Sequence, residues 1–348
     1  MDELLPALVA LGADLVVVAQ SRDTAWYRDL LPGVEVVAAP PAAARRPVRL
    51  LWEQTGLPRL ARRLGVDLVH CPHYTMPVAA GVPVVTTLHD ATFFSHPEVH
   101  LPVKRRFFQA WTRVSLRRAR RCITPSAATR DELVRLAGAR AGRIDVAHLG
   151  VDATRFHVPG PDERSAVRRL LGLDGPYVAF LGTLEPRKNV PALVRAWAGV
   201  PGAPALVLGG GRGWDTGIDA AVAEVPAGHD LRRPGYLPLD LLAGFLGGAE
   251  LVAYPSLGEG FGLPVLEAMA CGTAVLTTPR LSLPEVGGDA VAYAEPDVGA
   301  LRAALAELLA DPDRRERLAV AGVRRAAGFD WAACARAHLD SYRAAVAG

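Results

Sequence analysis

Short apolar runs recur along the first half of the chain and alternate with longer stretches of helical periodicity. The apolar runs are residues 14–19, 34–37, 66–70, 82–88 and 121–124. The helical stretches are residues 4–11, 50–64, 103–120 and 127–136. Strands that are apolar throughout are typical of a parallel sheet with helices on both faces. The pattern therefore predicts an α/β fold.

The same alternation continues in the second half, after a short segment rich in proline and glycine. The apolar run at residues 145–149 precedes that segment, and those after it are residues 177–181, 203–208, 251–254 and 273–278. The helical stretches are residues 164–171, 190–197, 265–270, 301–309, 314–328 and 332–345. Because Pro159, Gly160 and Pro161 are typical of a linker, we expect an N-terminal domain over residues 1–158, a second domain over 159–330 and a terminal helix over 331–348.

Composition narrows the class of protein. A chain of 348 residues, half of them hydrophobic, suits two domains of ordinary size. The net charge of +3 gives no reason to expect nucleic acid as a partner. The four cysteines are far apart and form no C-x-x-C pair, which argues against zinc or a disulfide framework and suits a reducing cytosol. No apolar run is long enough for a bilayer, so we expect a cytoplasmic protein.

The residues most indicative of chemistry lie between 254 and 276. A glycine-rich loop over 258–262 follows an apolar strand, and Pro264 fits the first position of a helix. Glu259 and Glu267 lie eight residues apart, on either side of the helix N-terminus, whose backbone N–H groups can bind an anion. Acidic side chains would repel a bare phosphate but bind hydroxyls beside it. The pattern therefore indicates a nucleotide sugar as ligand.

The segment EGFGLPVLEAMACG resembles the E-x7-E signature of the retaining GT-B glycosyltransferases of family four. The resemblance implies two Rossmann-like domains with parallel sheets that face across a cleft, with the donor on the second domain and the acceptor on the first. It also implies that Glu259 contacts hydroxyls of the donor sugar and that Glu267 holds the ribose. The residues that it places beside the sugar and phosphates are Gly260, Phe261, Gly262 and Leu263. The alternative is a capped helix with solvated acids.

A pair of adjacent cations follows the strand at residues 177–181. Arg187 and Lys188 lie between that strand and the next helix, which Asn189 can cap. Two cations at such a place can clamp a diphosphate, with the arginine bidentate and the lysine as a point charge. The pair matches the family's R-K pair, and Gly182 and Thr183 open the same donor-binding loop. The alternative is a surface loop.

Two further segments bear on the nucleotide. The strand at residues 203–208 ends in Gly209–Gly213, whose spacing fits neither the dinucleotide fingerprint nor the P-loop and so argues against a dehydrogenase or an ATPase. Tyr236 and Leu237 match a family turn beside the nucleotide base. Residues 283–288 resemble a family loop near the cleft.

Histidines follow two strands of the first half. His89 lies at the carboxyl end of a strand, where ligands collect in open α/β sheets. The family has a similarly placed histidine that faces the donor sugar; the alternative is a strand end bonded to a neighbouring loop. Asp90 can instead cap the helix that follows. His70 and His73 could line the acceptor cleft, or be structural.

The helix over residues 103–121 is strongly basic. Its apolar stripe is expected at Phe107, Ala110, Trp111 and Val114. Its basic residues, with no acid among them, are Lys104, Arg105, Arg106, Arg113, Arg117, Arg118, Arg120 and Arg121. Such a helix can lie on the anionic inner face of a membrane. The alternative is an ordinary helix that covers the sheet and has a solvated basic face.

The expected reaction is transfer of a hexose from a nucleoside diphosphate sugar to an acceptor hydroxyl of a glycan or glycolipid. The resemblance implies retained configuration and no metal, and the sequence has no D-x-D pair before the site. GTLEPRKN resembles mannosyltransferases of polysaccharide assembly, so GDP-mannose is the first candidate donor. The alternatives are UDP-glucose or another UDP-sugar, a degenerate binding protein, or a GT-B epimerase or phosphorylase. Neither Lys104 nor Lys188 has the context of a Schiff-base lysine, and no cofactor is expected.

Family domains begin with a strand and a glycine loop, whereas residues 2–8 resemble the helix that follows them. We therefore expect one strand too few in the first sheet, a gap in the cleft opposite Arg187, and low stability or activity. The missing piece would be roughly 15–25 upstream residues, about one strand and one loop.

Overall fold

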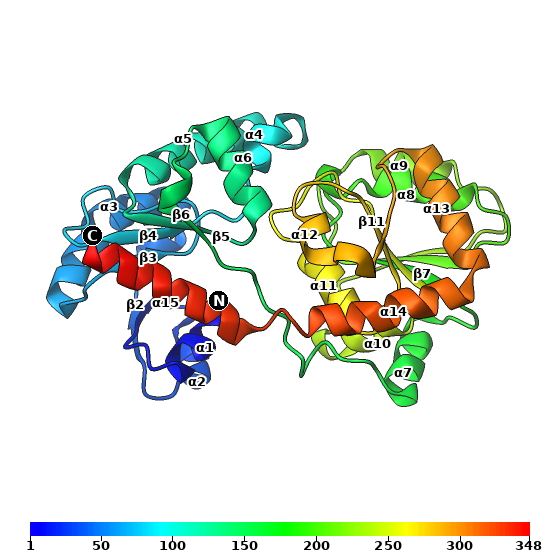
Figure 1. Ribbon diagram of the computed structural model, residues 1–348, viewed down its shortest axis with the longest axis horizontal. Helices are drawn as coiled ribbons and strands as arrows, with labels where there is room; N and C mark the ends of the chain where they lie inside the picture. Colours follow the sequence, from blue (N-terminus) through cyan, green and yellow to red (C-terminus); the bar gives the residue numbers. More distant parts are fainter. The chain divides into compact units, whose positions relative to one another are not determined.

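The computed structural model describes residues 1–348 and divides the chain into two compact units. The first unit comprises Met1–Gly150 and Asp330–Gly348, and the second comprises Val151–Phe329. In Figure 1 the C-terminal helix α15 (Trp331–Ala347, red) lies beside the N-terminal helix α1 (Leu4–Ala10, blue). Both ends of the chain therefore belong to one folding unit.

The strands of the first unit form two parallel sheets and not a single one. β1 (Val16–Ala19) pairs with β2 (Glu35–Ala38) alone. The second sheet has the order β3-β4-β5-β6. Its strands are β3 (Val69–Cys71), β4 (Val84–Thr87), β5 (Arg121–Thr124) and β6 (Ile144–Val146). The sequence predicts these strands and a first sheet with one strand too few, and the structure interrupts that sheet between β1 and β3.

Helices cover both faces of the four-stranded sheet. On one face, α1 and α15 pack over Val85 and Ile123, which are fully buried. The other face carries a core around Leu88, Cys122 and Leu133. The helices on that face are α4 (Thr92–Ser95), α5 (Pro102–Arg118) and α6 (Ala127–Ala137). The unit is completed by α2 (Thr24–Leu30) and α3 (Arg46–Leu64).

Helix α5 faces the core with a different side from the one the sequence predicts. Ala110, in the expected apolar stripe, is exposed, whereas Thr112 and Ser115 are fully buried. Ser115 Oγ donates a hydrogen bond of 2.6 Å to Tyr74 O, and Phe108 packs into the core beside it. The prediction is wrong because a short hydroxyl side chain with a backbone acceptor can be buried as readily as an apolar one.

The second unit is built on one six-stranded parallel sheet of order β12-β11-β10-β7-β8-β9. Its strands are β7 (Tyr177–Leu181), β8 (Ala205–Gly209), β9 (Leu231–Gly235), β10 (Leu251–Tyr254), β11 (Val275–Thr277) and β12 (Ala292–Tyr293). The central strands are buried on both faces, as the continuous apolar runs predict.

Helices pack on both sides of this sheet. Figure 1 shows α8 (Val190–Ala198), α9 (Gly217–Ala223) and α13 (Val298–Ala310) together on one face. The helices that gather on the other face are α10 (Leu242–Gly247), α11 (Leu263–Ala270) and α14 (Pro312–Ala326), with α7 (Pro161–Leu171) against α10. The expected loop at 283–288 is largely the short helix α12 (Leu283–Gly287), because proline fits the first turn of a helix. Six single turns of 3₁₀ helix lie at Pro41–Ala44, Pro97–Val99, Ala141–Arg143, Pro186–Lys188, Leu239–Leu241 and Gly288–Ala290.

The sequence places the domain boundary after residue 158, whereas the structure places it before Val151. Val151 N donates to Phe329 O at 3.1 Å, and Pro159 packs beside Gly247, so this segment belongs to the second unit. The linker-like prolines mark the start of α7. All four cysteines are free and buried. None of the helices combines the length and apolar character needed to cross a bilayer.

Candidate functional site

The candidate site lies at the carboxyl edge of the second sheet, in the loops after β7 and β10. These two strands are hydrogen-bonded neighbours, with Val178 beside Leu251 and Ala179 beside Val252. Parallel neighbours end at the same edge of a sheet, so the loops that follow them meet there. The structure thus brings Arg187 and Lys188, more than sixty residues earlier in the chain, next to Glu259.

The loop after β7 turns through the single 3₁₀ turn Pro186–Lys188 into α8. Asn189 has a left-handed backbone with φ of 57° and makes no side-chain cap on α8, so the predicted cap is wrong. Its Nδ2 donates instead to Pro296 O at 2.7 Å. Leu257 N donates to Arg187 O at 2.9 Å, and Ser256 Oγ lies 3.1 Å from the same oxygen. These bonds fix the two loops against each other.

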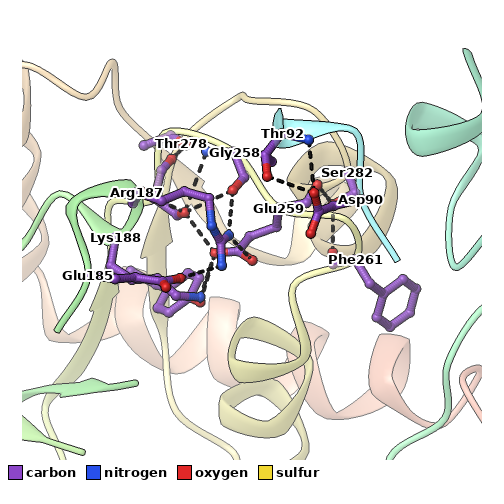
Figure 2. A network of polar contacts seen from close by, with 12 residues as sticks. Asp90, Thr92, Glu185, Arg187, Lys188, Gly258, Glu259, Phe261, Thr278 and Ser282 are labelled. Carbon is purple, nitrogen blue, oxygen red and sulfur yellow. Dashed lines mark hydrogen bonds and ion pairs between the residues drawn. The ribbon is translucent and has the colours of Figure 1, made fainter. Parts of the chain in front are cut away.

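Arg187, Lys188 and Glu259 form a buried network of ion pairs, shown in Figure 2. The Arg187 guanidinium pairs with Glu259 Oε2, and Lys188 Nζ lies 2.7 Å from Glu259 Oε1. A second carboxylate, Glu185, accepts from Arg187 Nη2 at 2.6 Å. Tyr254 and Ser256 each donate a hydroxyl hydrogen bond to Glu259 Oε1, at 2.9 and 2.7 Å. Both cations are thus held in fixed orientations.

Burial and charge set the ionisation of this network. Burial alone would raise the pKa of Glu259, but the charges of Lys188 and Arg187 outweigh it and hold the pKa at about 2. Burial lowers the pKa of Lys188, and Glu259 offsets part of that shift. Only 8% of Lys188 and 7% of Glu259 is exposed. The two cations face two carboxylates, so the network as a whole is neutral.

Glu267 is the second acid of the motif, and its surroundings differ from those of Glu259. It lies on α11, is half-buried, and its carboxylate makes no hydrogen bond or ion pair. Burial raises its pKa to about 7, although the charges of Arg155 and Lys188 offset part of the shift. A carboxylate that is desolvated and unpartnered gains most from a ligand that supplies hydroxyl donors.

The glycine loop joins Glu259 to α11. Ser282 Oγ lies 2.8 and 2.9 Å from the carbonyl oxygens of Glu259 and Phe261 and can donate to either one (Figure 2). This contact anchors the glycine loop to the segment that precedes α12. Phe261 is buried, with its ring 5.8 Å from that of Phe329. Gly262 has φ of 104°, which a side chain would strain, and Leu263 starts the helix immediately after it. Gly260 and Phe261 thus lie in a turn that is held by hydrogen bonds and packing.

The other predicted donor-binding residues surround the same edge. Gly182 N donates to Gly209 O at 3.0 Å, and Thr183 follows in the loop. Gly213 lies so close to Leu184 O that a Cβ there would be 1.9 Å away, which explains the glycine run after β8 by packing. Tyr236 follows β9 with 81% of its surface exposed, and Leu237 packs beside Gly209.

The histidines that the sequence singles out lie in the first unit. His89 Nε2 donates to Pro72 O at 2.6 Å, so this nitrogen carries the proton, and burial lowers the pKa of the ring. His73 packs against the His89 ring at 5.6 Å. His70 is held by Thr87 and Tyr342, each at 2.8 Å, and burial lowers its pKa to about 3. His70 is therefore a satisfied structural histidine.

Asp90 holds the start of α4. Its Oδ1 accepts from Thr92 N at 2.9 Å and from Thr92 Oγ1 at 2.6 Å. This is an Asx turn. The N-cap residue of α4 is Ala91 and has no side-chain cap, so Asp90 braces the start of the helix from one residue before the cap.

The sequence misses three members of the network: Glu185, Tyr254 and Ser256. Tyr254 reads as the last residue of an apolar strand, and only its place at the carboxyl end of β10 could have marked it. The surface-loop alternative for Arg187 and Lys188 is wrong, since both side chains are largely buried. In the whole chain, no group of three His, Cys, Asp or Glu side chains is arranged to hold a metal ion.

The chain matches known families and relatives along most of its length. The first 155 residues match the family model described as Glycosyltransferase Family 4, and residues 162–325 match Glycosyl transferases group 1. O-antigen chain mannosyltransferase B of Escherichia coli is 34% identical over 285 residues, which cover 79% of this chain and 74% of that protein. D-inositol 3-phosphate glycosyltransferase of Nocardia farcinica is also 34% identical, over 80% of this chain and 67% of that one.

Solved structures agree in fold. The Anabaena protein Alr3699/HepE in complex with UDP-glucose has a TM-score of 0.78 at 19% identity, over 98% of this chain and 95% of that one. Sucrose-phosphate synthase of Thermosynechococcus elongatus has a TM-score of 0.77 at 23% identity, over 97% and 90%. The two α/β units of parallel strands thus share the fold of these structures, the GT-B fold.

The chain belongs to glycosyltransferase family four. It is thus an enzyme, a glycosyltransferase.

Proposed function

We propose that this enzyme is a retaining hexosyltransferase whose acceptor is a hydroxyl of a glycan or glycolipid and whose first candidate donor is GDP-mannose. The observation that carries the proposal is the buried network of Arg187, Lys188 and Glu259 at the carboxyl ends of β7 and β10. A diphosphate leaving group gains negative charge as its bond to the sugar breaks. Fixed cations at that point stabilise the transition state without reorganising.

In this proposal, the positive charge that stabilises the leaving diphosphate comes from these residues alone. The bond between the anomeric carbon and the diphosphate oxygen breaks, and the acceptor oxygen bonds to the same carbon on the same face. The acceptor proton passes to the leaving phosphate oxygen. Arg187 and Lys188 take up the charge of the departing diphosphate, so the transfer is proposed to be independent of metal and of any cofactor. Glu259 orients both cations. It also contacts the hydroxyls of the donor sugar.

Other parts of the donor have their own contacts in this proposal. Glu267 binds the ribose hydroxyls, because its carboxylate has no partner within the protein. The exposed ring of Tyr236, with Leu237, lies by the base. The glycine loop lies by the sugar and phosphates, as do Gly182 and Thr183. His89 is proposed to contact the donor sugar.

The identity to the Escherichia coli mannosyltransferase supports mannose, and the alternative donors are UDP-glucose and other UDP-sugars. A panel of nucleotide sugars, scored by protection against thermal unfolding, separates them. A donor at 100 times its Kd stabilises by about 2.7 kcal/mol, or a Tm shift of roughly 5–10 °C for a unit of this size. GDP-mannose should give the largest shift, and equal or larger shifts with UDP-sugars would refute the choice of sugar.

Turnover distinguishes the enzyme from a degenerate binding protein. Release of GDP from GDP-mannose should be measurable without acceptor and faster with a glycan acceptor. Lys188→Met should bind donor but release GDP roughly 100-fold or more slowly. Arg195→Met, which removes an exposed cation on α8, is the matched control and should leave the rate unchanged. Binding without release in the unaltered protein would favour the scaffold alternative.

We also propose that α5 makes peripheral contact with an anionic membrane that carries the acceptor. The structure leaves six of the basic residues of this region exposed: Lys104, Arg106, Arg113, Arg117, Arg118 and Arg120. Arg121 belongs to β5 and is neutralised by Asp145. Beside the basic face, Leu101 and Val103 are 61% and 82% exposed. Apolar side chains next to cations are what an interfacial helix offers to lipid.

Vesicle co-sedimentation tests this contact. Each surface arginine is worth about 1 kcal/mol on an anionic leaflet, so R106Q/R113Q/R117Q should weaken binding by about 100-fold. The triple variant R62Q/R63Q/R317Q removes exposed arginines elsewhere and serves as control. Equal binding to neutral and anionic vesicles, or equal loss in both variants, would refute the membrane contact.

A further inference from the structure

The loop after β3 turns at Tyr74, whose backbone is left-handed. Its φ is 53°, a value that an aromatic residue rarely adopts. Thr75 N donates to His73 O at 2.5 Å, so these three residues form a γ-turn. A γ-turn with a positive φ at its centre belongs to the rare and strained class. Strain of this kind persists only where the surrounding structure imposes it, and it is concentrated at functional sites.

Contacts from three neighbouring elements hold Tyr74 in this conformation. Its amide donates to Thr87 O at 3.0 Å, and its carbonyl oxygen accepts from Ser115 Oγ at 2.6 Å. Its ring is buried, with the rings of Phe93 and Phe108 at 5.9 and 5.0 Å. Because β4, α4 and α5 all contact this one residue, the core of the first unit imposes the strained turn.

The hydroxyl of Tyr74 contacts the segment that contains His89. Asp90 N donates to Tyr74 Oη at 3.0 Å, and Tyr74 Oη lies 3.4 Å from Asp90 O. A tyrosine hydroxyl can accept one hydrogen bond and donate another, so it suits both backbone groups. The rings of Tyr74 and His89 lie 5.9 Å apart. Tyr74 therefore connects the loop after β3 to the loop after β4.

The same loop also contacts the His89 ring directly, through Pro72, two residues before Tyr74. His89 Nε2 donates to Pro72 O at 2.6 Å, whereas Nδ1 makes no hydrogen bond in the structure. Burial lowers the pKa of this ring, so it is neutral at pH 7. In a neutral imidazole, the hydrogen bond at one nitrogen determines which nitrogen carries the proton. With the proton on Nε2, Nδ1 has a free lone pair and can accept a hydrogen bond from a hydroxyl.

We propose that Tyr74 is a positioning residue that fixes the tautomer and the orientation of His89. The strained turn at Tyr74 places Pro72 O against Nε2, and the Tyr74 hydroxyl holds the backbone next to His89. Nδ1 is thereby kept as a hydrogen-bond acceptor. The opposite tautomer would present an N–H at Nδ1 and would set a lone pair against Pro72 O. That this acceptor binds a hydroxyl of the donor sugar rests on the proposed function, whereas the tautomer itself does not.

The variant Tyr74→Phe tests this role, because it removes the hydroxyl and keeps the ring in the core. Long-range proton–nitrogen correlation spectra distinguish the protonated nitrogen of each histidine ring from the unprotonated one. The His89 signals are identified by their absence from the spectrum of His89→Ala. Tyr177→Phe is the matched control, since it also removes a buried hydroxyl, which donates to Phe245 O at 2.7 Å in the second unit. The spectra require neither a bound donor nor turnover.

His89 should be protonated at Nε2 alone in the unaltered protein and in Tyr177→Phe. In Tyr74→Phe, the form protonated at Nδ1 should become detectable, with a population of about 10% or more. In that variant kcat/KM should fall by about 10-fold, the effect of one hydrogen bond, while Tm stays within a few degrees of that of Tyr177→Phe. An unchanged tautomer in Tyr74→Phe, the same change in Tyr177→Phe, or a proton on Nδ1 in the unaltered protein would overturn the proposal. Full activity of His89→Ala would instead contradict the proposed contact with the sugar and leave the tautomer result standing.

Discussion

Replacing Glu259 removes the one carboxylate that Arg187 and Lys188 share. Its pKa falls from an ordinary value of 4.5 to about 2 in the folded protein, which corresponds to roughly 3 kcal/mol of stability at pH 7. Breaking a buried ion pair by removing one partner costs about 3–5 kcal/mol. The two routes agree, so Glu259→Ala should lower the free energy of unfolding of the second unit by about 3–5 kcal/mol.

Urea unfolding followed by tryptophan fluorescence measures this loss, since Trp197 is buried in the second unit. Glu224→Ala is the matched control, because Glu224 pairs with Arg195 through two short bonds but is exposed. Its removal should leave the midpoint unchanged, as exposed pairs contribute little. A loss in Glu259→Ala no larger than in Glu224→Ala would refute the argument that this network is desolvated and strongly coupled.

The dependence on pH gives an independent test of the same network. A carboxyl with a lowered pKa stabilises the fold above its unfolded pKa and loses that contribution as pH falls through the folded pKa. The stability difference between the unaltered protein and Glu259→Gln should therefore be constant above pH 5 and vanish between about pH 4.5 and 2. A difference that does not change over this range would show that packing, and not charge, is responsible.

The remaining predictions concern donor and acceptor chemistry. Glu267→Gln should raise Tm at pH 8 but not at pH 5, because a carboxyl whose pKa is raised to about 7 destabilises the fold once it ionises. The same variant should weaken donor binding, measured by calorimetry at pH 8. An unchanged affinity would contradict the ribose contact. Arg187→Met should lower kcat by about 100-fold or more while KM changes little, and a KM effect alone would contradict transition-state stabilisation. His89→Ala should lower turnover without lowering Tm by more than a few degrees, and full activity would remove His89 from the site.

The sequence predicts most strands and the main helices because continuous apolar runs and 3.6-residue periodicity report burial directly. It also predicts that Arg187 and Glu259 act together, since both follow strands of one parallel sheet. It does not show that the two strands are neighbours. That pairing of β7 with β10 turns two separate motifs into one network, and it depends on sheet order, which no local pattern contains.

Two other predictions, for the buried face of α5 and for the cap of α8, fail for reasons that the residue type alone does not show. Thr112 and Ser115 are polar in the sequence but buried in α5, because their hydroxyls are short enough for the helix to approach the sheet. Asn189 is a good cap by residue type, yet it takes a left-handed backbone and bonds to Pro296. The hydrogen-bond partners of Ser115 and Asn189, Tyr74 and Pro296, lie far away in the chain. Residue type constrains what a side chain can do, and tertiary structure selects among those options.

The neutrality of the network has a consequence for how the donor is bound. Arg187 and Lys188 already have Glu185 and Glu259 as partners. In the proposed reaction, an incoming diphosphate would therefore add negative charge to a site whose cations are already paired. Attraction in the ground state is therefore weaker than two free cations would give. As the bond to the sugar breaks, charge builds on the phosphate oxygen and each fixed N–H donor gains more from it than from the unreacted donor. Stabilisation that grows along the reaction raises turnover and not only affinity. If the proposed function is correct, the carboxylates serve catalysis in two ways: they hold the cations in place, and they limit how tightly the unreacted donor is held.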